Sequence, residues 1–598
     1  MGKNGKHKVD AAGWRRTSSG WKSAVILAVI WVLWVAVMYY LLLPALNIHS
    51  VGMWMFVIFV MLFPAGGLGC VWMVIRAAQD GTKDYNRYGR PAGICMGGAG
   101  VLLLIFLLLL LIGAKMFHAD GYASILPVEE YDFHEDMNQA PAVSNIALMD
   151  TDSAVLLGNR EIGSLSDVVS QYNVSEDYSQ IDLAGSPVKV SALDYAGFFK
   201  YMGNKDDGVP GYVRVDPVGQ HAEYVALEQG MKYVPSAYFS KDLRRHIRSK
   251  YPTKIFDNIH FEVDEEGNPF YVASVYDYTI GVFGGETVKG AIVCDPVSGD
   301  CMYYEAADVP HWVDNVFDGD LLVEQYNWYG KLSGGFWNSV FGKKGCKKCT
   351  ETVNGNSSDD EDEDETFAPD YGYVAKDGDI WIYTGVTSVN DDASNIGFIM
   401  VNERTAEAHY YVVAGADESS AMAAAEGEVQ EKGYQASFPS LINVDDQPTY
   451  IMVLKDASGI VKLYAMVNVE SYNMVTTAVS LDDCFAKYRT LLGMGESGMD
   501  ANEDETDEDG DKAEENLKGD GAAQPTEPVE TSEMSFIVSA IHYIDVDGST
   551  WVYLSGEDGN VYKQRFADNE NLIFLAVGDN VTAQCAEVSP RIYQMYSE

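Results

Sequence analysis

The chain has 598 residues, of which 47% are apolar, and a formal net charge of −47. Residues 1–118 contain 11 Lys/Arg and 3 Asp/Glu, whereas the remainder contains 30 Lys/Arg and 85 Asp/Glu. The chain therefore has a basic end and a strongly acidic end, which are physically different regions. Because so acidic a surface repels polyanions, the composition argues against DNA or RNA as a partner.

Three apolar runs near the N-terminus are long enough to cross a bilayer. They cover residues 24–46, 51–75 and 92–114, and none contains a charged residue. The hydrocarbon core of a bilayer requires roughly 20 such residues in a helix. The runs therefore predict three transmembrane helices. Because no ionisable group lies within them, we expect an anchor rather than an ion pathway.

The placement of Lys and Arg predicts how these helices are oriented. Six basic residues precede the first run, none lies in the loop 47–50, and four lie between the second and third runs. Both basic segments are therefore expected in the cytoplasm, and everything after Phe117 outside it. The predicted location is the plasma membrane, with several spans, a cytoplasmic N-terminus and an extracytoplasmic C-terminal part.

Two acidic segments of low complexity, 354–366 and about 495–533, divide the extracytoplasmic part. Their composition predicts solvated, disordered linkers. The expected regions are a basic N-terminus, the anchor, a first unit, an acidic linker, a second unit, an acidic linker and a small domain. Their boundaries are 1–23, 24–117, 118–350, 351–368, 369–494, 495–533 and 534–598.

The two units share one order of elements: hairpin, helix, hairpin, hairpin and a closing helical segment. In the first unit these are 211–225, a helix with Phe239, Leu243 and Ile247 on its core face, 258–277, 288–305 and 309–317. In the second they are 397–412, 418–433, 440–456, 461–477 and 481–492. The pattern predicts a duplicated α+β unit, with an antiparallel sheet covered by helices.

Residues 534–598 alternate short β-rich stretches with Asp-Gly turns at 547–548 and 558–559. This pattern predicts a small barrel of five or six strands. The stretch resembles an OB-like barrel. The predicted fold class is therefore α+β: three transmembrane helices, two sheet-plus-helix units and a C-terminal β-barrel.

The first unit carries three motifs in order: KYP at 250–252, EGNPFYV at 266–272 and DPVSG at 295–299. They resemble a PepSY-type module, in which a helix ending in Tyr-Pro leads into a hairpin and then a strand ending in Asp-Pro-x-x-Gly. That last motif predicts a turn, because Pro presets φ and Gly adopts a left-handed conformation. The second unit shares only the layout, since VNVE at 467–470 stands where Asp-Pro is expected.

The whole extracytoplasmic part is also similar to a family of uncharacterised bacterial membrane proteins with several N-terminal spans. The likeness is carried by VFGGETVKG at 282–290 and EQYNWYG at 324–330. It implies an envelope protein and names no reaction. The PepSY-type resemblance implies a non-catalytic module, and some such modules are thought to restrain peptidases.

The sequence shows no catalytic, metal-binding or cofactor motif. The 10 His residues are scattered, and His260 and Glu262 share a strand face without a visible third ligand. Cys294 and Cys301 flank a turn and are expected either to form a disulfide or to remain buried thiols. Cys346 and Cys349 form a CxxC, for which a small structural disulfide is expected and a redox role is the alternative.

A basic helix stands out in the acidic part of the chain. Its residues are Lys241, Arg244, Arg245, Arg248 and Lys250. With the apolar residues of this helix facing the core, the basic side chains are expected to point outward. They form a candidate site for an anionic wall polymer or a lipid head group, and the alternative is that they pair with the acidic surface of the chain itself.

These observations favour a non-catalytic, membrane-anchored scaffold that binds or regulates another protein of the cell envelope. The first alternative is an assembly factor that binds an anionic wall polymer through the basic helix. The second is a hydrolase whose site forms only on folding. The expected partners are the lipid bilayer and either an envelope protein or a wall polymer; no cofactor and no nucleic acid are expected.

Overall fold

The computed structural model describes the chain in twelve segments and one isolated residue. They are residues 13–82, 85, 88–137, 149–217, 219–352, 368–369, 371–390, 394–493, 532–546, 549–556, 560–565, 580–589 and 592–596. The two predicted acidic linkers lie almost entirely outside the described residues. The chain forms two compact units, Met1–Met499 and Asp500–Glu598, and each is described by itself.

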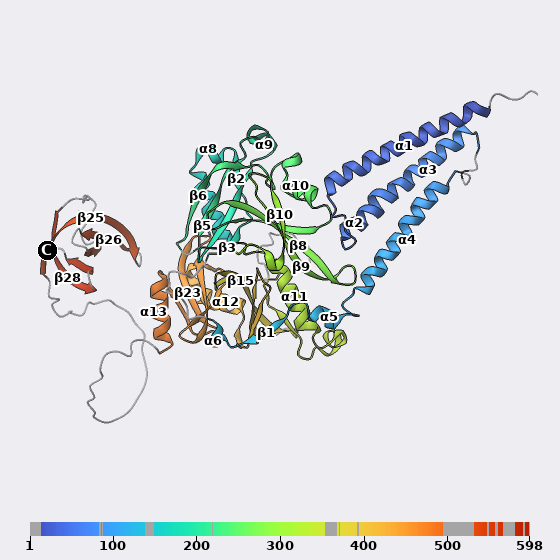
Figure 1. The fold of residues 1–598 in the computed structure, drawn as a ribbon. Helices are drawn as coiled ribbons and strands as arrows, with labels where there is room; N and C mark the ends of the chain where they lie inside the picture. The colour runs from blue at the N-terminus through green and yellow to red at the C-terminus, as the bar shows by residue number, and fades with distance from the viewer. Residues whose placement is uncertain are drawn as a thin grey trace, which may run out of the picture. The chain divides into compact units, whose positions relative to one another are not determined.

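Three long apolar helices open the first unit, as the sequence predicts (Figure 1). They are α1 (Gly13–Leu42), the continuous run α2 (Val51–Met55), η1 (Phe56–Leu62) and α3 (Phe63–Gln79), and α4 (Arg90–Ile112). The stretches long and apolar enough to span a membrane are Trp21–Leu42, Val51–Gln79 and Arg90–Ile112. The chain therefore contains a membrane-spanning region.

The first helix ends before its apolar run does. Helical geometry stops at Leu42, whereas the run continues to residue 46. Leu43 has a positive φ of 47°, and Pro44 follows it. A residue before proline is disfavoured in the helical region, so the sequence itself ends the helix here. The loop to α2 then contacts the domain that follows: the Leu46 amide donates to the Pro252 carbonyl at 2.7 Å.

Two antiparallel sheets begin the domain that follows the helices. The five-stranded sheet has the order β2-β4-β5-β6, with β3 beside β4, and the four-stranded sheet has the order β10-β9-β8-β7. The strands of the five-stranded sheet are β2 (Tyr172–Val174), β3 (Ser179–Leu183), β4 (Ser186–Tyr195), β5 (Val209–Asp216) and β6 (His221–Met231). The strands of the other are β7 (Ile255–Val263), β8 (Pro269–Ile280), β9 (Gly284–Cys294) and β10 (Cys301–Glu305). One hydrophobic core packs between them.

The predicted hairpins of the first unit form at 209–231, 255–280 and 284–305. The first of them lies in a sheet of its own, however, whose remaining strands come from 172–195, a region without predicted elements. The turn after β9 is also as predicted, since Gly299 has a φ of 83° and Asp295 accepts the Val297 amide at 2.8 Å.

Two details of the first unit differ from the prediction. Phe239 lies in a 3-10 turn, η4 (Phe239–Lys241), and is exposed, whereas Leu243 and Ile247 of α10 (Leu243–Lys250) are fully buried. The φ of Phe239 is 58°, so the regular helix begins only after it and the four-residue spacing does not place it on the same face. Residues 309–317, all of them described, follow an irregular path instead of a closing helix.

A six-stranded sheet crosses the expected boundary between the two units. Its order is β1-β18-β17-β15-β11, with β14 also beside β15. The strands are β1 (Val128–Tyr131), β11 (Lys347–Cys349), β14 (Gly372–Lys376), β15 (Asp379–Ser388), β17 (Gly397–Asn402) and β18 (Ala408–Tyr411). Since β1 and β11 precede the acidic linker and the other four strands follow it, the two predicted units share a sheet.

The second predicted unit supplies a five-stranded antiparallel sheet and two helices. The strands are β20 (Gln435–Ala436), β21 (Ser440–Val444), β22 (Gln447–Lys455), β23 (Val461–Asn468) and β24 (Val475–Ala478). The helices are α12 (Glu418–Gly427) and α13 (Leu481–Leu491), close to their predicted positions. Separate hydrophobic cores form under α12 and under α13, so the sheet is covered on both faces.

Short elements complete the first unit. They are α5 (Ala119–Ala123), α6 (Phe133–Asp136), α7 (Thr151–Gly163), α8 (Ser166–Val169), α9 (Phe198–Asn204), η5 (Ala306–Asp308), α11 (Gly319–Leu332), η6 (Asn338–Gly342), β12 (Glu351–Thr352), β13 (Ala368–Pro369), β16 (Ser394–Asn395), β19 (Gly415–Ala416) and η7 (Gln430–Lys432). Of these, α11 packs its buried face against the six-stranded sheet and against α5.

The second unit of the chain is a closed barrel of five strands, in the order β25-β26-β27-β29-β28. The strands are β25 (Ser532–Val546), β26 (Ser549–Gly556), β27 (Val561–Arg565), β28 (Asn580–Ser589) and β29 (Ile592–Tyr596). Phe536, Leu554 and Tyr562 are among the buried residues of its core. The predicted C-terminal β-barrel is therefore present.

The shared sheet predicts that residues 369–494 do not fold alone. Without β1, β11 and α11, the face of β15 and β17 that carries Ile382 and Ile399 loses its cover. We expect a fragment 369–494 to lack a cooperative thermal transition by circular dichroism, and a fragment 119–494 to have one. A cooperative transition of the short fragment would contradict the shared core.

Candidate functional site

The basic helix is the site that the sequence predicts, and the structure gives its residues partners within the chain. The ammonium of Lys241 lies 4.0 Å from the centroid of the Tyr233 ring. Lys250, at the end of α10, donates to the Gly299 carbonyl at 2.6 Å. Lys250 therefore holds the turn at the end of the neighbouring hairpin, whereas Lys241 packs on an aromatic ring.

Of the first two arginines of this helix, Arg244 is exposed and Arg245 is partly buried. Arg244 forms an ion pair with Asp257, and both side chains are substantially exposed. Arg245 donates from Nη1 to the Phe239 carbonyl at 2.6 Å, and its guanidinium lies 4.2 Å from the centroid of the Tyr40 ring on α1. The helix therefore touches the end of the first membrane span.

Arg248 does not point outward as expected, because it is only 6% exposed. Its Nε donates to the Leu43 carbonyl at 3.0 Å, and Nη1 donates to the Lys254 carbonyl at 2.5 Å. The guanidinium also lies 4.1 Å from the centroid of the Phe256 ring. Burial lowers the pKa of Arg248 to about 10, so the group remains charged at neutral pH. Arg248 joins the domain to the end of α1.

The cysteines divide into one bonded pair and several thiols. Cys294 and Cys301 form a disulfide across the β9–β10 hairpin. Cys346 and Cys349 are both buried and are not joined to each other, so the disulfide expected in the CxxC is not formed. The physical reason is that β11 turns them to different partners: Cys346 lies against the Lys331 carbonyl, and Cys349 lies in the core of the six-stranded sheet.

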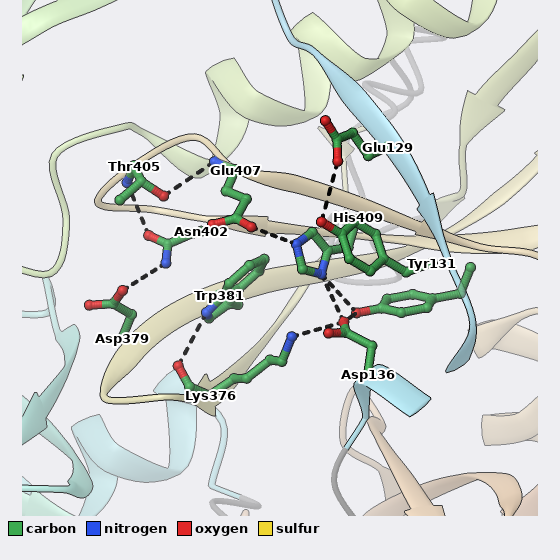
Figure 2. Close-up of polar contacts among 11 residues, drawn as sticks. Glu129, Tyr131, Asp136, Lys376, Asp379, Trp381, Asn402, Thr405, Glu407 and His409 are labelled. Carbon is green, nitrogen blue, oxygen red and sulfur yellow. Dashed lines mark hydrogen bonds and ion pairs between the residues drawn. The ribbon is translucent and has the colours of Figure 1, made fainter. Parts of the chain in front are cut away.

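The densest polar network surrounds His409 on β18 (Figure 2). Its Nδ1 lies 2.8 Å from Oδ2 of Asp136, and its Nε2 lies 2.9 Å from Oε1 of Glu407. The Tyr131 ring stacks on the imidazole with 3.7 Å between centroids. The Trp381 ring packs edge-on at 4.9 Å. The histidine is buried between two carboxylates and two aromatic rings.

Asp136 accepts three hydrogen bonds on one carboxylate oxygen. The donors are Lys376 at 2.8 Å, the Tyr411 hydroxyl and His409. Burial alone would raise the pKa of Asp136, but these hydrogen bonds outweigh it and lower the pKa. Burial and the charge of Asp136 raise the pKa of Tyr411. Asp136 is therefore ionised at neutral pH and holds three groups together.

A second group fixes the turn that carries Glu407. Asp379 accepts from both Nε and Nη2 of Arg404, at 2.7 and 2.6 Å, and from Nδ2 of Asn402 at 2.8 Å. The Thr405 hydroxyl then accepts the Glu407 amide at 3.3 Å. A bidentate arginine pair is geometrically specific, so the β17–β18 turn is rigid and keeps Glu407 beside the histidine.

This geometry is that of a structural junction. The two carboxylates occupy both ring nitrogens of His409, so neither is left to accept a proton from a substrate. Its side chain is also almost wholly buried. The partners come from distant parts of the chain, because Asp136 on α6 lies 273 residues before His409. The network fastens the segment that leaves the membrane to the six-stranded sheet.

Buried carboxylates gather at a second place, beside β7 and the irregular segment 309–317. Glu262 accepts the Asp314 amide at 3.1 Å and the Asn315 amide at 3.0 Å, and His260 lies 3.0 Å from it. Burial and the Glu262 charge raise the pKa of Asp314 to about 9. Glu262 is therefore bound by backbone amides and by His260, not by a metal ligand set. The described residues contain no group of three His, Cys, Asp or Glu suited to a metal.

Next to these carboxylates, Lys189 on β4 lines a cavity of about 210 Å³. Burial lowers the pKa of Lys189 to about 8, and the charges of Asp150 and Glu403 partly offset this. Burial also raises the pKa of Glu403 well above its usual range. The Lys189 ammonium lies 3.4 Å from the Thr151 hydroxyl. Taken together, these groups form a buried polar layer between the sheets.

Comparisons with known proteins identify no relative. No family model matches the chain, and no curated protein is similar to it. Among solved structures, a crystal structure of an ACO/RPE65 chimera matches with 8% identity and a TM-score of 0.16, covering 52% of this chain and 61% of the chimera. The chain thus spans less than two thirds of that protein, and so low a TM-score carries no argument about fold or function.

The sequence did not reveal the His409 network. Glu407 and His409 are close in sequence, with Glu407 at the end of the β17–β18 turn and His409 on β18, but Asp136 and Lys376 come from distant elements. The only local signal in the sequence was a histidine within the short strand 408–411, preceded by a glutamate. An alternating strand predicts an outward-facing histidine, and only the packing of β1 and α6 over this face buries it.

The Asp136 contacts predict a pH-dependent stability. A carboxyl with a lowered pKa stabilises the fold above its unfolded pKa of about 3.9, and this contribution is lost as pH falls through the folded value. At neutral pH, Asp136→Asn should cost about 3 kcal/mol, because Lys376 and His409 lose a buried charged partner. Urea unfolding at pH 7 and at decreasing pH measures both effects.

The matched control is Glu407→Gln, which touches the same histidine from an exposed position. It should cost less than about 1 kcal/mol, as exposed ion pairs do. The fall in the free energy of unfolding at low pH should become smaller in Asp136→Asn and should remain in Glu407→Gln. Equal losses in the two variants would contradict the junction.

Arg248 supplies a second prediction. Arg248→Met leaves the Leu43 and Lys254 carbonyls without their donor, and should lower the free energy of unfolding by about 3 kcal/mol. Arg248→Lys should not restore it, because one ammonium cannot reproduce the guanidinium geometry. Arg244→Met, which removes an exposed ion pair, should cost less than about 1 kcal/mol. Thermal unfolding of the full chain in detergent distinguishes these outcomes, and equal effects at the two arginines would refute the assignment.

Proposed function

We propose that this protein is a non-catalytic, membrane-anchored scaffold of the cell envelope that binds or regulates another protein. The observation that carries the proposal is an exposed aromatic pair at η6. Trp337 and Phe341 are 61% and 77% exposed, and their rings stack with 5.7 Å between centroids. Exposed aromatic side chains held in a fixed arrangement are typical anchors of protein interfaces.

The support of this pair is rigid. Phe336, which precedes it, packs against Tyr122, Ile280 and Trp328 beneath the pair. Asn338 donates from Nδ2 to the Lys344 carbonyl at 2.9 Å and so closes the turn. The aromatic rings are thus presented by a preorganised element, which reduces the entropy lost on binding.

The proposed location is extracytoplasmic, with the N-terminus in the cytoplasm. The distribution of Lys and Arg around the spans supports this orientation. The Cys294–Cys301 disulfide supports it independently, because disulfides persist in oxidising compartments. The two lines of support come from different parts of the chain.

We also propose that the two sheet-plus-helix units are PepSY-like and that the C-terminal barrel is OB-like. In support of the first, α10 precedes the four antiparallel strands β7–β10, and α12 precedes β21–β24. In support of the second, five strands close the barrel. Membership of the bacterial membrane family suggested by 282–290 and 324–330 is part of the same proposal.

The contacts of the basic helix bear on the alternative, an anionic wall polymer. Arg248 is buried and bonded within the chain, whereas Arg244 is exposed and has an exposed ion pair. A hydrolase would require a group free to transfer protons. The engaged nitrogens of His409 do not favour it.

Proximity cross-linking and pull-down from native membranes test the proposal. The full chain should capture the same envelope protein repeatedly, and the double variant Trp337→Ser with Phe341→Ser should lose it. The control, Tyr472→Ser, removes an exposed aromatic ring from another surface and should keep the partner. Recovery of wall polymer alone, lost in Lys241→Glu with Arg244→Glu, would reject the scaffold in favour of polymer binding.

A further inference from the structure

An aromatic patch covers the surface where α9 meets η4. It consists of Phe198, Phe199, Tyr238 and Phe239, and Phe199 is 87% exposed. Phe198 lies at the centre, with its ring centroid 5.1 Å from that of Tyr238, 5.7 Å from Phe199 and 6.3 Å from Phe239. A contiguous exposed patch of this kind marks a binding surface.

One residue of the patch, Phe239, has a backbone conformation that is unfavourable for its residue type. Phe239 has a φ of 58°, a left-handed conformation that bulky residues rarely adopt. Arg245 Nη1 donates to the Phe239 carbonyl at 2.6 Å, and the Tyr201 hydroxyl donates to the Tyr238 carbonyl at 3.0 Å. Strain that is maintained by specific contacts is common where a side chain has a task.

The patch adjoins the point where the first span ends. Arg245, which holds the Phe239 carbonyl, lies over the Tyr40 ring in the last turns of α1. Arg248, one turn further along α10, bonds the Leu43 carbonyl. Figure 1 shows α10 beside this end of α1. Residues close to the end of a transmembrane helix are close to the bilayer surface, and Arg245 links the patch to this end of α1.

Cations accompany the aromatic rings, although the chain after residue 118 is strongly acidic. Lys200 lies on α9, and Lys241, Arg244 and Arg245 lie on η4 and α10. Aromatic rings beside basic groups suit the boundary between acyl chains and phosphate groups. We propose that the aromatic patch inserts into the headgroup region of the adjacent lipid leaflet, with these cations at the phosphates of anionic phospholipids.

Photo-cross-linking of the full chain in vesicles tests this. Phe199 is replaced by benzoylphenylalanine, and the purified protein is reconstituted in phosphatidylcholine containing phosphatidylglycerol. Mass spectrometry should find lipid adducts at this position, several-fold more than with the same residue at Tyr472, an exposed aromatic position in the β23–β24 connection. Adducts to protein instead of lipid, or equal lipid labelling at both positions, would overturn the proposal.

Two further variants test the role of the cations and the role of the aromatic patch separately. Lys241→Glu with Arg244→Glu should reduce the Phe199-position adducts several-fold in vesicles with phosphatidylglycerol, and much less in phosphatidylcholine alone. Phe239→Gly relieves the positive φ, so its melting temperature in detergent should not fall while lipid adducts decrease. If the charge variant had the same effect in both lipids, or if Phe239→Gly left the adducts unchanged, the patch would not be a lipid site.

Discussion

Where the acidic domain meets the end of the first span, the buried guanidinium of Arg248 donates to the Leu43 carbonyl. Pro44 ends the first span early and leaves carbonyl groups without helical partners next to the bilayer, where an unpaired polar group is costly. A guanidinium can serve two carbonyls at once while packing on an aromatic ring. The basic helix therefore satisfies a requirement that the Leu43-Pro44 step creates. Arg248 therefore has a structural role here, in a chain with a net charge of −47.

Away from this contact, strands and side chains from before the acidic linker pack with strands from after it. The strands β1 and β11 enter a sheet otherwise built from residues beyond the acidic linker, and Asp136 bonds Lys376, His409 and Tyr411 across the same junction. The hydrophobic cores hold the sheets and helices together. The buried charged side chains determine how these elements align, since each such side chain has few acceptable partners. The parts of the domain on either side of the acidic linker thus belong to one compact unit.

Much of the fold could be predicted because it depends on local pattern. The three spans, the hairpins from 209 to 305, α12, α13 and the barrel all follow from periodicity and turn residues. The elements between 119 and 195 were missed, because short strands such as β2 and β3 lack a clear alternation and acquire their strand form from β4. Phe239 was placed wrongly because spacing does not reveal a reversed φ.

The candidate site was predicted less well, for a related reason. The basic residues were found, since charge density can be read from the sequence, but the burial of Arg248 depends on α1, which lies 205 residues away. The His409 network depends on contacts over still longer separations. The hairpin cysteines were visible because both flank one turn, whereas the CxxC pair is kept apart by the different neighbours of each thiol. Contacts between distant segments are set by packing, which no local pattern encodes.

The parallel pairing of β1 with β18 has a consequence for how the protein is made. Val128 leaves the ribosome soon after the third span, yet its partner Ala408 follows only much later. Throughout that interval the strand, the Asp136 carboxylate and the apolar side of α5 await their partners. Long-range pairing of this kind is slow and exposes unpaired edges. The domain therefore cannot complete this sheet until the residues beyond the acidic linker have been synthesised, and until then the membrane-proximal strand has no partner from β18.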